Sequence, residues 1–166
     1  GMYERFVPQV PFISSLFSQW GGTVGDPENC IKMLQKDEAV IVFPEGARGI
    51  SKSFRKRYEL QRFGLGFMYM ALQTKSPVIP VGMVGFEESM INFGNMDRVQ
   101  KLSGFPAAPM LLPFVFPTKV IINIGKPIYF SGDITREYQV QEKVDEVKAE
   151  VKKLMNIGLE QRKSIF

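Results

Sequence analysis

VIVFPEGARG, residues 40–49, joins an apolar run directly to a charged turn. The run from 40 to 43 is rich in β-branched residues, which predicts a short buried strand. Pro44 has no N–H to donate to a central ladder, so the strand should end there. The stretch therefore predicts a strand that passes straight into a turn, and the rest of the fold is expected to form around it.

Two opposite charges, Glu45 and Arg48, follow the predicted strand. Gly46 and Gly49 allow the backbone to turn tightly and to bring its N–H groups close to a ligand. Open α/β sheets place their ligand sites at the ends of strands, so one interpretation is a binding site. The other is a surface turn closed by a Glu–Arg ion pair, and the residue types alone favour neither.

The flanking segments predict an α/β layered fold. We expect a helix from Pro27, because proline suits the first helical position, and a second helix over 63–74. Residues 78–84 predict another buried strand, in which Pro80 indicates the start of the strand, a bulge or an edge. Strand 40–43, the second helix and strand 78–84 then form a βαβ-like unit, whose strands should pair in parallel through a right-handed crossover.

The C-terminal part predicts one more strand and a long closing helix. Residues 119–124 form the strand, a Gly-Lys-Pro turn closes it, and 128–130 extend it. An amphipathic helix over 135–153 has a charged face toward solvent and an apolar stripe made of Val140, Val144, Val147, Val151 and Leu154. We therefore expect one domain over residues 1–166, an α/β fold with a mixed, mostly parallel sheet flanked by helices.

Composition limits the possible chemistry. The 166 residues, of which 45% are hydrophobic and 23% charged, are typical of a globular domain with a sizeable core. The chain has no histidine and a single cysteine, Cys30, which we expect in a helix core. These counts exclude a Ser-His-Asp or Cys-His arrangement, a Cys/His zinc site and an internal disulfide within these residues. A net charge of +4 favours anionic partners such as phosphate esters, nucleic acid or acidic membranes.

A basic run follows the turn, with Glu59 as its only acid and with five cations: Lys52, Arg55, Lys56, Arg57 and Arg62. A solvated face is the ordinary interpretation of such a run. Its place directly after the charged turn favours a basic rim that attracts a phosphorylated substrate or an anionic lipid surface. Nucleic-acid-binding motifs are absent, so we expect no nucleic-acid partner. Further along, Glu87 and Glu88 are candidates for catalysis, although solvent exposure is the simpler expectation.

Residues 105–117 are apolar and contain four prolines, which argues against a regular helix or a central strand. Such a loop either covers the core or faces an apolar partner. The functional interpretations are a shallow contact with a membrane surface and an acyl-chain groove.

Three motifs together resemble the PlsC-type glycerolipid acyltransferases, the lysophosphatidic acid acyltransferase superfamily. FPEGARG at 43–49 resembles the third conserved block of that family, which reads FPEG, then Thr, Ser or Ala, then Arg. VIPVGMVG at 78–85 resembles the fourth block, an apolar run around a proline. INIGKPI at 122–128 is similar to the strand and Gly-x-Pro-Ile turn near the end of these domains. The resemblance implies a glycerol-3-phosphate acyltransferase-like fold.

The resemblance also implies an activity. A fatty acyl group would pass from acyl-CoA or acyl carrier protein, as co-substrate and with no further cofactor or metal, to a hydroxyl of a lysophospholipid, glycerol phosphate or acylglycerol. Membrane glycerolipids and acyl-CoA would be the partners, with peripheral contact at the cytoplasmic face of a membrane. Arg48 would meet phosphate. The substrate-binding candidates are Pro44, Glu45, Gly46, Arg48, Lys52, Arg55 and Pro80.

The chain departs from the family pattern at two places. The family's HxxxxD motif, in which the His is the base and the Asp orients it, is absent, so we expect no catalytic residue in this chain. We expect an N-terminally truncated, soluble part of a longer protein that carries the motif upstream. Pro27 stands where the second block usually has an Arg, so Lys52 or Arg55 would assist Arg48, and a less charged acceptor such as an acylglycerol is also consistent. The alternative class is a non-catalytic lipid- or anion-binding domain on the same fold.

Overall fold

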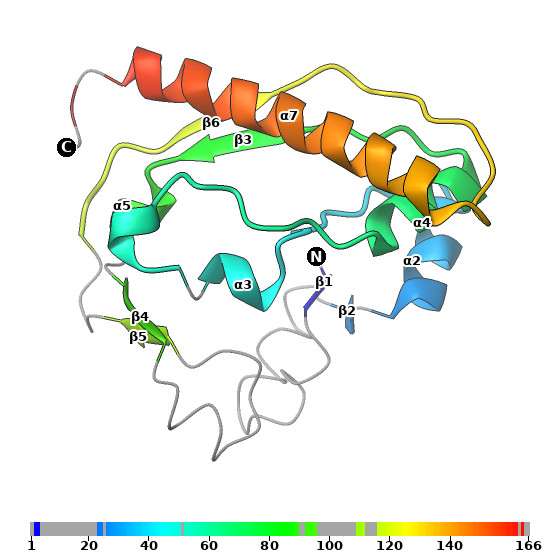
Figure 1. Ribbon diagram of the computed structural model, residues 1–166, viewed down its shortest axis with the longest axis horizontal. Helices are drawn as coiled ribbons and strands as arrows, with labels where there is room; N and C mark the ends of the chain where they lie inside the picture. Colours follow the sequence, from blue (N-terminus) through cyan, green and yellow to red (C-terminus); the bar gives the residue numbers. More distant parts are fainter. Residues whose placement is uncertain are drawn as a thin grey trace.

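The computed structural model describes residues 2–3, 23–24, 26–50, 52–89, 92–95, 109–111, 116–162 and 164. Helices and short strands follow one another along these residues (Figure 1). Their order is β1 (Met2–Tyr3), β2 (Thr23–Val24), α2 (Pro27–Leu34), α3 (Ala47–Ile50), the 3₁₀ helix η2 (Phe54–Lys56), α4 (Gly66–Thr74), β3 (Val81–Val84), α5 (Phe86–Ser89), β4 (Asn92–Asn95), β5 (Pro109–Leu111), β6 (Ile121–Ile124) and α7 (Glu137–Gln161).

Each described sheet has two strands. β1 and β2 pair in parallel, whereas β3 pairs with β6 and β4 pairs with β5 in the antiparallel sense. Opposite one another in the β3–β6 pair are Val81 and Ile124, Gly82 and Asn123, Met83 and Ile122, and Val84 and Ile121. An isolated antiparallel bridge between Val78 and Ile128 continues this pair.

The expected parallel pairing between strands 40–43 and 78–84 was wrong. β3 pairs antiparallel with β6, and no strand forms over 40–43. Ile41 and Phe43 are each 63% exposed, so the run is not a buried strand. A β-branched run shows that a segment can pair, but the ladder it joins depends on which segment the rest of the chain brings alongside.

Pro80 and Pro27 stand where the sequence predicted an element to begin. Pro80 is buried directly before β3, and its carbonyl accepts the N–H of Gly125 at 2.9 Å, so the interpretation of Pro80 as the start of the strand is confirmed. α2 begins at Pro27, after Asp26 in an extended conformation. Cys30 is its buried residue, as expected for a small side chain in the core.

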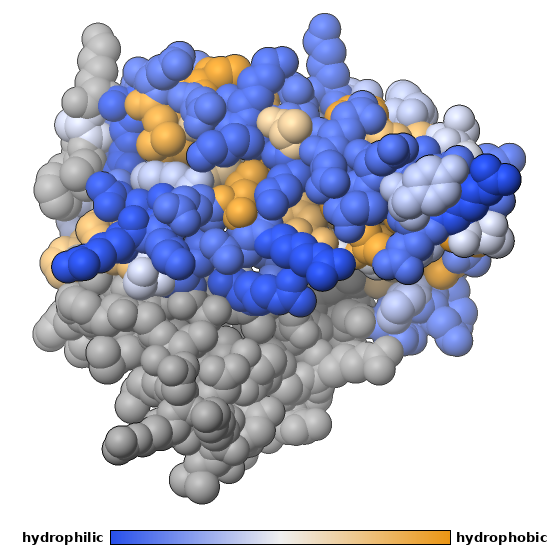
Figure 2. All heavy atoms as spheres, in the orientation of Figure 1, coloured by the Kyte–Doolittle hydropathy of each residue, from blue (hydrophilic) through white to orange (hydrophobic). Residues whose placement is uncertain are grey.

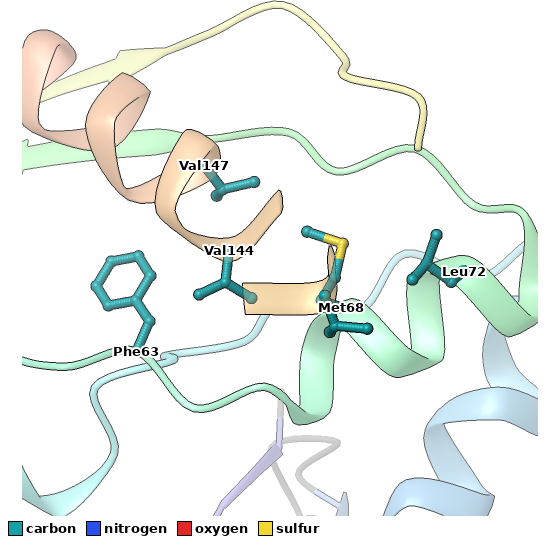
Figure 3. Close-up of a cluster of buried hydrophobic side chains, with 6 residues drawn as sticks. Phe63, Met68, Leu72, Val144 and Val147 are labelled. Atoms are coloured by element: carbon teal, nitrogen blue, oxygen red, sulfur yellow. The ribbon is translucent and has the colours of Figure 1, made fainter. Parts of the chain in front are cut away.

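The core lies between α4 and the N-terminal half of α7 (Figure 3). One cluster of buried side chains there consists of Phe63, Met68, Leu72, Val140, Val144 and Val147. The three valines recur every three or four residues, which places them on one face of α7 and confirms the predicted stripe. Burying each such side chain contributes about 1.5–3 kcal/mol. α4 begins at Gly66 rather than at Phe63, which reaches the core from the preceding loop.

Two glycines set how closely α7 packs on the β3–β6 pair, which it crosses in Figure 1. A Cβ on Gly82 would stand 2.6 Å from Cβ of Leu154, and one on Gly158 would stand 3.0 Å from Cγ2 of Val84. Real Cβ atoms do not approach as closely as 2.6 Å, so at Gly82 the helix lies at a distance that only glycine permits, whereas at Gly158 a Cβ would require a small shift of its neighbours.

The outer face of α7 is polar, as its charge pattern predicted. Figure 2 shows hydrophilic side chains over most of the described part of this face, with small apolar patches between them. In the part of the chain that the structure describes, no helix has the length and apolar character needed to cross a bilayer. Most of the Pro-rich segment 105–117, on which the membrane hypothesis rests, lies outside the described residues.

Candidate functional site

The turn at 44–49 is closed by backbone hydrogen bonds. Gly46 adopts a positive φ of 57°, which suits glycine, and its N–H donates to the carbonyl of Phe43 at 3.0 Å. The N–H of Gly49 donates to the carbonyl of Gly46 at 3.1 Å. The carbonyl of Pro44 accepts the N–H of Gly64 at 2.8 Å, which ties the turn to the segment before α4.

The carboxylate of Glu45 is held on three sides. Its Oε1 accepts the backbone N–H of Gln61 at 2.5 Å, and its Oε2 lies 3.7 Å from Nζ of Lys52. On the third side is Gly49, where a Cβ would stand 2.6 Å from Oε2. The side chain is 17% exposed, so the turn presents a fixed carboxylate rather than a freely rotating one.

Lys52 is buried among oxygen atoms instead of forming part of an open basic rim. Its Nζ lies 2.7 Å from Oε1 of Glu87 and donates to the carbonyl of Glu59 at 2.9 Å. Its side chain is only 5% exposed. The ammonium therefore links the carboxylates of Glu45 and Glu87. Together these three residues, which we call the carboxylate–lysine cluster, carry one net negative charge.

The remaining basic residues of this region and Pro80 have different surroundings. Arg48, on α3, and Arg55, in η2, are exposed to solvent. Arg57 stacks over the ring of Phe54, with Cζ 4.6 Å from its centroid. Pro80 is buried at the start of β3, at the opposite end of the strand from α5, so its surroundings are those of a packing residue.

The expectation of solvent exposure was wrong for Glu88, whereas the side chain of Glu87 is 33% exposed. Glu87 binds Lys52, and its Oε2 accepts the backbone N–H of Tyr58 at 2.7 Å. Glu88 is 8% exposed and forms ion pairs with Nη1 of Arg162 and, at 3.6 Å, with Nε of Arg57. Buried carboxylates need such partners, and both arginines come from segments whose proximity a local pattern does not reveal.

The sequence analysis missed Gln61 as a partner of Glu45, Glu87 as a partner of Lys52, and Tyr58 as a partner of Glu87. Gln61 contributes a backbone N–H, which has no sequence signature. The hydroxyl of Tyr58 accepts from the N–H of Gly85 at 3.1 Å and from Nη1 of Arg162 at 3.0 Å. Burial and the nearby charge of Glu88 raise the pKa of Tyr58 above its ordinary value of 10, while these two donors oppose the shift. The phenol is therefore held in its neutral form.

Among the described residues, no cluster of three or more His, Cys, Asp or Glu side chains could hold a metal ion. The turn presents a fixed carboxylate and an exposed arginine, groups whose chemistry can bind and orient a polar ligand.

Comparisons with known proteins show which family and which fold the chain resembles. A family model described as Acyltransferase matches residues 5–84. The fold matches the crystal structure of the 1-acyl-sn-glycerophosphate (LPA) acyltransferase PlsC from Thermotoga maritima, with a TM-score of 0.63 over 98% of this chain and 57% of that one. Over residues 5–84 the chain is therefore similar to the Acyltransferase family. At 20% identity, the match to PlsC shows that the chain shares its fold.

Curated relatives align with almost all of the chain. An uncharacterized protein of Mycobacterium tuberculosis is 32% identical, over 95% of this chain and 48% of its own length. A Bos taurus protein named "DGAT1/2-independent enzyme synthesizing storage lipids" is 27% identical, over 93% of this chain and 46% of its own length. The chain thus spans about half the length of the curated relatives it matches.

Proposed function

We propose that this chain binds and orients the acceptor in an O-acyltransferase of glycerolipid metabolism. The fatty acyl group would come from acyl-CoA or acyl carrier protein, and the acceptor would be a lysophospholipid or an acylglycerol. The observation that carries the proposal is the fixed Glu45 carboxylate beside the exposed Arg48, on a turn whose sequence matches the family's third block. The similarity of residues 5–84 to the Acyltransferase family model supports the same reaction class.

The chemistry is a direct transfer. The acceptor hydroxyl oxygen attacks the thioester carbonyl carbon, a C–O bond forms, the C–S bond breaks, and the hydroxyl proton passes to a base while the thiol leaves. The chain has no histidine, so under this proposal its residues position the acceptor and the family's His base is supplied from elsewhere.

The proposed roles follow from where each side chain lies. Arg48 is exposed on α3 and would contact the phosphate or glycerol oxygens of the acceptor. Glu45 would accept a hydrogen bond from an acceptor hydroxyl. Lys52 is enclosed by carboxylates, so its role would be to hold Glu45 rather than to bind phosphate directly. Arg55 is exposed and would attract an anionic headgroup.

The partners we propose are membrane glycerolipids and acyl-CoA, met at the cytoplasmic face of a membrane through peripheral contact. The basic residues after the turn support this proposal, because exposed cations next to a lipid surface gain from its negative potential. Arg55, Lys56 and Arg62 are exposed in the structure.

The test measures acyl-CoA consumption by the full-length protein, with the release of free thiol as the readout. Lysophosphatidic acid, lysophosphatidylcholine, monoacylglycerol and diacylglycerol would be offered in turn as acceptors. Thiol release that depends on one of them supports the enzyme. A protein that binds these lipids or acyl-CoA yet releases no thiol with any acceptor would instead be the alternative, a non-catalytic lipid-binding domain.

The variant Arg48→Ala tests whether the guanidinium binds the phosphate of the acceptor. If the guanidinium binds phosphate, kcat/KM with lysophosphatidic acid should fall by about 30-fold or more, as expected for a charge-assisted hydrogen bond. With monoacylglycerol the fall should be smaller. Arg136→Ala removes another exposed arginine, before α7, and should leave both rates unchanged. Equal losses with both acceptors would contradict the phosphate role.

A further inference from the structure

Tyr58 is the residue at which the carboxylate–lysine cluster meets the end of α7. Its backbone N–H donates to Glu87 at 2.7 Å, and its carbonyl accepts from Nζ of Lys152 at 2.9 Å. Its hydroxyl accepts from the N–H of Gly85 and from Nη1 of Arg162. Contacts from α5, from the residue before it and from α7 therefore converge on this one side chain and its backbone.

The backbone of Tyr58 supports a special role for this position. Its φ is 66°, in the left-handed region that residues other than glycine rarely adopt. Such a conformation persists where the surroundings hold it, and here both backbone polar groups of the residue are bound.

The line of contacts from Tyr58 to the charged turn passes through α5. Gly85 immediately precedes α5 and Glu87 lies within it. Glu87 holds Lys52 at 2.7 Å, and Lys52 lies 3.7 Å from Glu45. Without the hydroxyl, the N–H of Gly85 loses its acceptor, so one of the contacts that hold the start of α5 is lost, while Thr118 still donates to the carbonyl of Gly85 at 2.9 Å.

The line of contacts ends, beyond Tyr58, in a buried ion pair at the end of α7. The side chains of Arg162 and Glu88 are 5% and 7% exposed, and they form an ion pair that joins the end of α7 to α5. Arg162 also donates to the hydroxyl of Tyr58. Breaking a buried ion pair is strongly unfavourable, so this end of the line of contacts does not move independently.

We propose that Tyr58 is a positioning residue for the acceptor, acting through α5 on the carboxylate–lysine cluster. Its hydroxyl fixes α5 against the end of α7, and α5 in turn sets the place of Lys52 and Glu45. The inference rests on the proposed function, because the place of Glu45 matters for acyl transfer only if this carboxylate orients the acceptor. The end of α7 then sets acceptor geometry in addition to covering the core.

Tyr58→Phe in the full-length protein tests the proposal by steady-state kinetics, with acyl-CoA and whichever of lysophosphatidic acid and monoacylglycerol the wild type acylates. kcat/KM for the acceptor should fall about tenfold, the cost of one hydrogen bond to a charged group, while KM for acyl-CoA stays unchanged. Tyr129→Phe is the matched control, since Tyr129 is 75% exposed. Unchanged acceptor kinetics in Tyr58→Phe would overturn the proposal, and so would an equal loss for acceptor and donor.

Amide hydrogen exchange by NMR on the 166-residue chain gives a readout that needs no activity. Exchange of the Gln61 N–H, which donates to Glu45, should accelerate about tenfold in Tyr58→Phe but not in Tyr129→Phe. The amide of Val144, in the core, should exchange as in the wild type. Unchanged exchange at Gln61 would overturn the positioning role, whereas a wild-type protein that transfers no acyl group would overturn the proposed function instead.

Discussion

At the scale of single residues, Gly49 is a position where a larger side chain would displace a residue of the candidate site. Its Cα lies so close to Glu45 that a methyl group has no place between them. The second glycine of the motif therefore does more than permit a turn: it leaves the space that the carboxylate occupies. Arg48, its neighbour, is exposed.

Gly49→Ala should push the Glu45 carboxylate off its contacts with Gln61 and Lys52, because the new Cβ would stand 2.6 Å from Oε2. We expect acceptor kcat/KM of the full-length protein to fall at least about tenfold, the cost of one charged hydrogen bond. Gly66→Ala is the control, since nothing lies within 4 Å of its Cβ. A fully active Gly49→Ala enzyme would show that Glu45 need not hold its place.

The raised pKa of Tyr58 predicts how the stability of the chain depends on pH. Because the pKa of its phenol is raised above 10 in the folded chain, the neutral form is favoured by folding. That contribution is fully present below pH 10 and is lost as pH rises through the higher folded pKa, so stability should fall in strongly alkaline solution. Thermal unfolding of Tyr58→Phe should show a weaker alkaline decline than the wild type. Tyr129→Phe should keep the wild-type slope, and identical slopes in all three proteins would contradict the assignment.

At the scale of elements, the packing of α7 on β3 decides stability. Gly82 lies under the backbone of α7, where a Cβ would meet Cβ of Leu154 at 2.6 Å and backbone atoms of the helix at 2.7 Å. Backbone cannot rotate away as a side chain can. Gly158 faces the side chains of Val84 and Asn123 instead, at 3.0 and 3.2 Å, which have some freedom to adjust.

Gly82→Ala should therefore destabilise the chain by about 1–3 kcal/mol, the usual cost of overpacking a core. Gly158→Ala should cost less. Denaturant unfolding of both variants, with Gly66→Ala as the control, measures the difference. A Gly82→Ala chain as stable as the wild type would mean that α7 can move away from the sheet without loss.

Sequence patterns predicted elements well where the signal lies within the element. Pro27 marked the start of α2, and the valine stripe marked the buried face of α7. The run at 40–43 carried an equally clear strand pattern, yet pairing depends on a partner and β3 pairs with β6. Periodicity reports what one segment prefers, and ladder partners are set by the whole chain.

The candidate site was predictable only in its contiguous part. Glu45, Gly46 and Arg48 belong to one motif and lie on one turn, so their proximity follows from the sequence. The contact between Lys52 and Glu87 joins residues 35 positions apart, and the contact between Tyr58 and Arg162 joins residues 104 apart. No local pattern distinguishes such a lysine from the exposed cations beside it.

At the scale of the whole molecule, the prediction concerns activity. The 166-residue chain has no histidine, and we expect it to release no thiol from acyl-CoA with any lysophospholipid or acylglycerol acceptor. Thiol release by the isolated chain and by the full-length protein, at equal molar concentration, makes the comparison. An acceptor-dependent rate in the isolated chain that disappears in Glu45→Ala would contradict this expectation and place the proton transfer within these residues.

The position of α7 at the end of the chain has a consequence for synthesis. Met68, in α4, and Val84, in β3, are fully buried, and the contacts that bury them include residues of α7. Because α7 is translated after both of them, the core cannot close until nearly all of these residues have left the ribosome. Until then the nascent chain exposes its future core, which is the condition under which chaperones bind and partly made proteins aggregate.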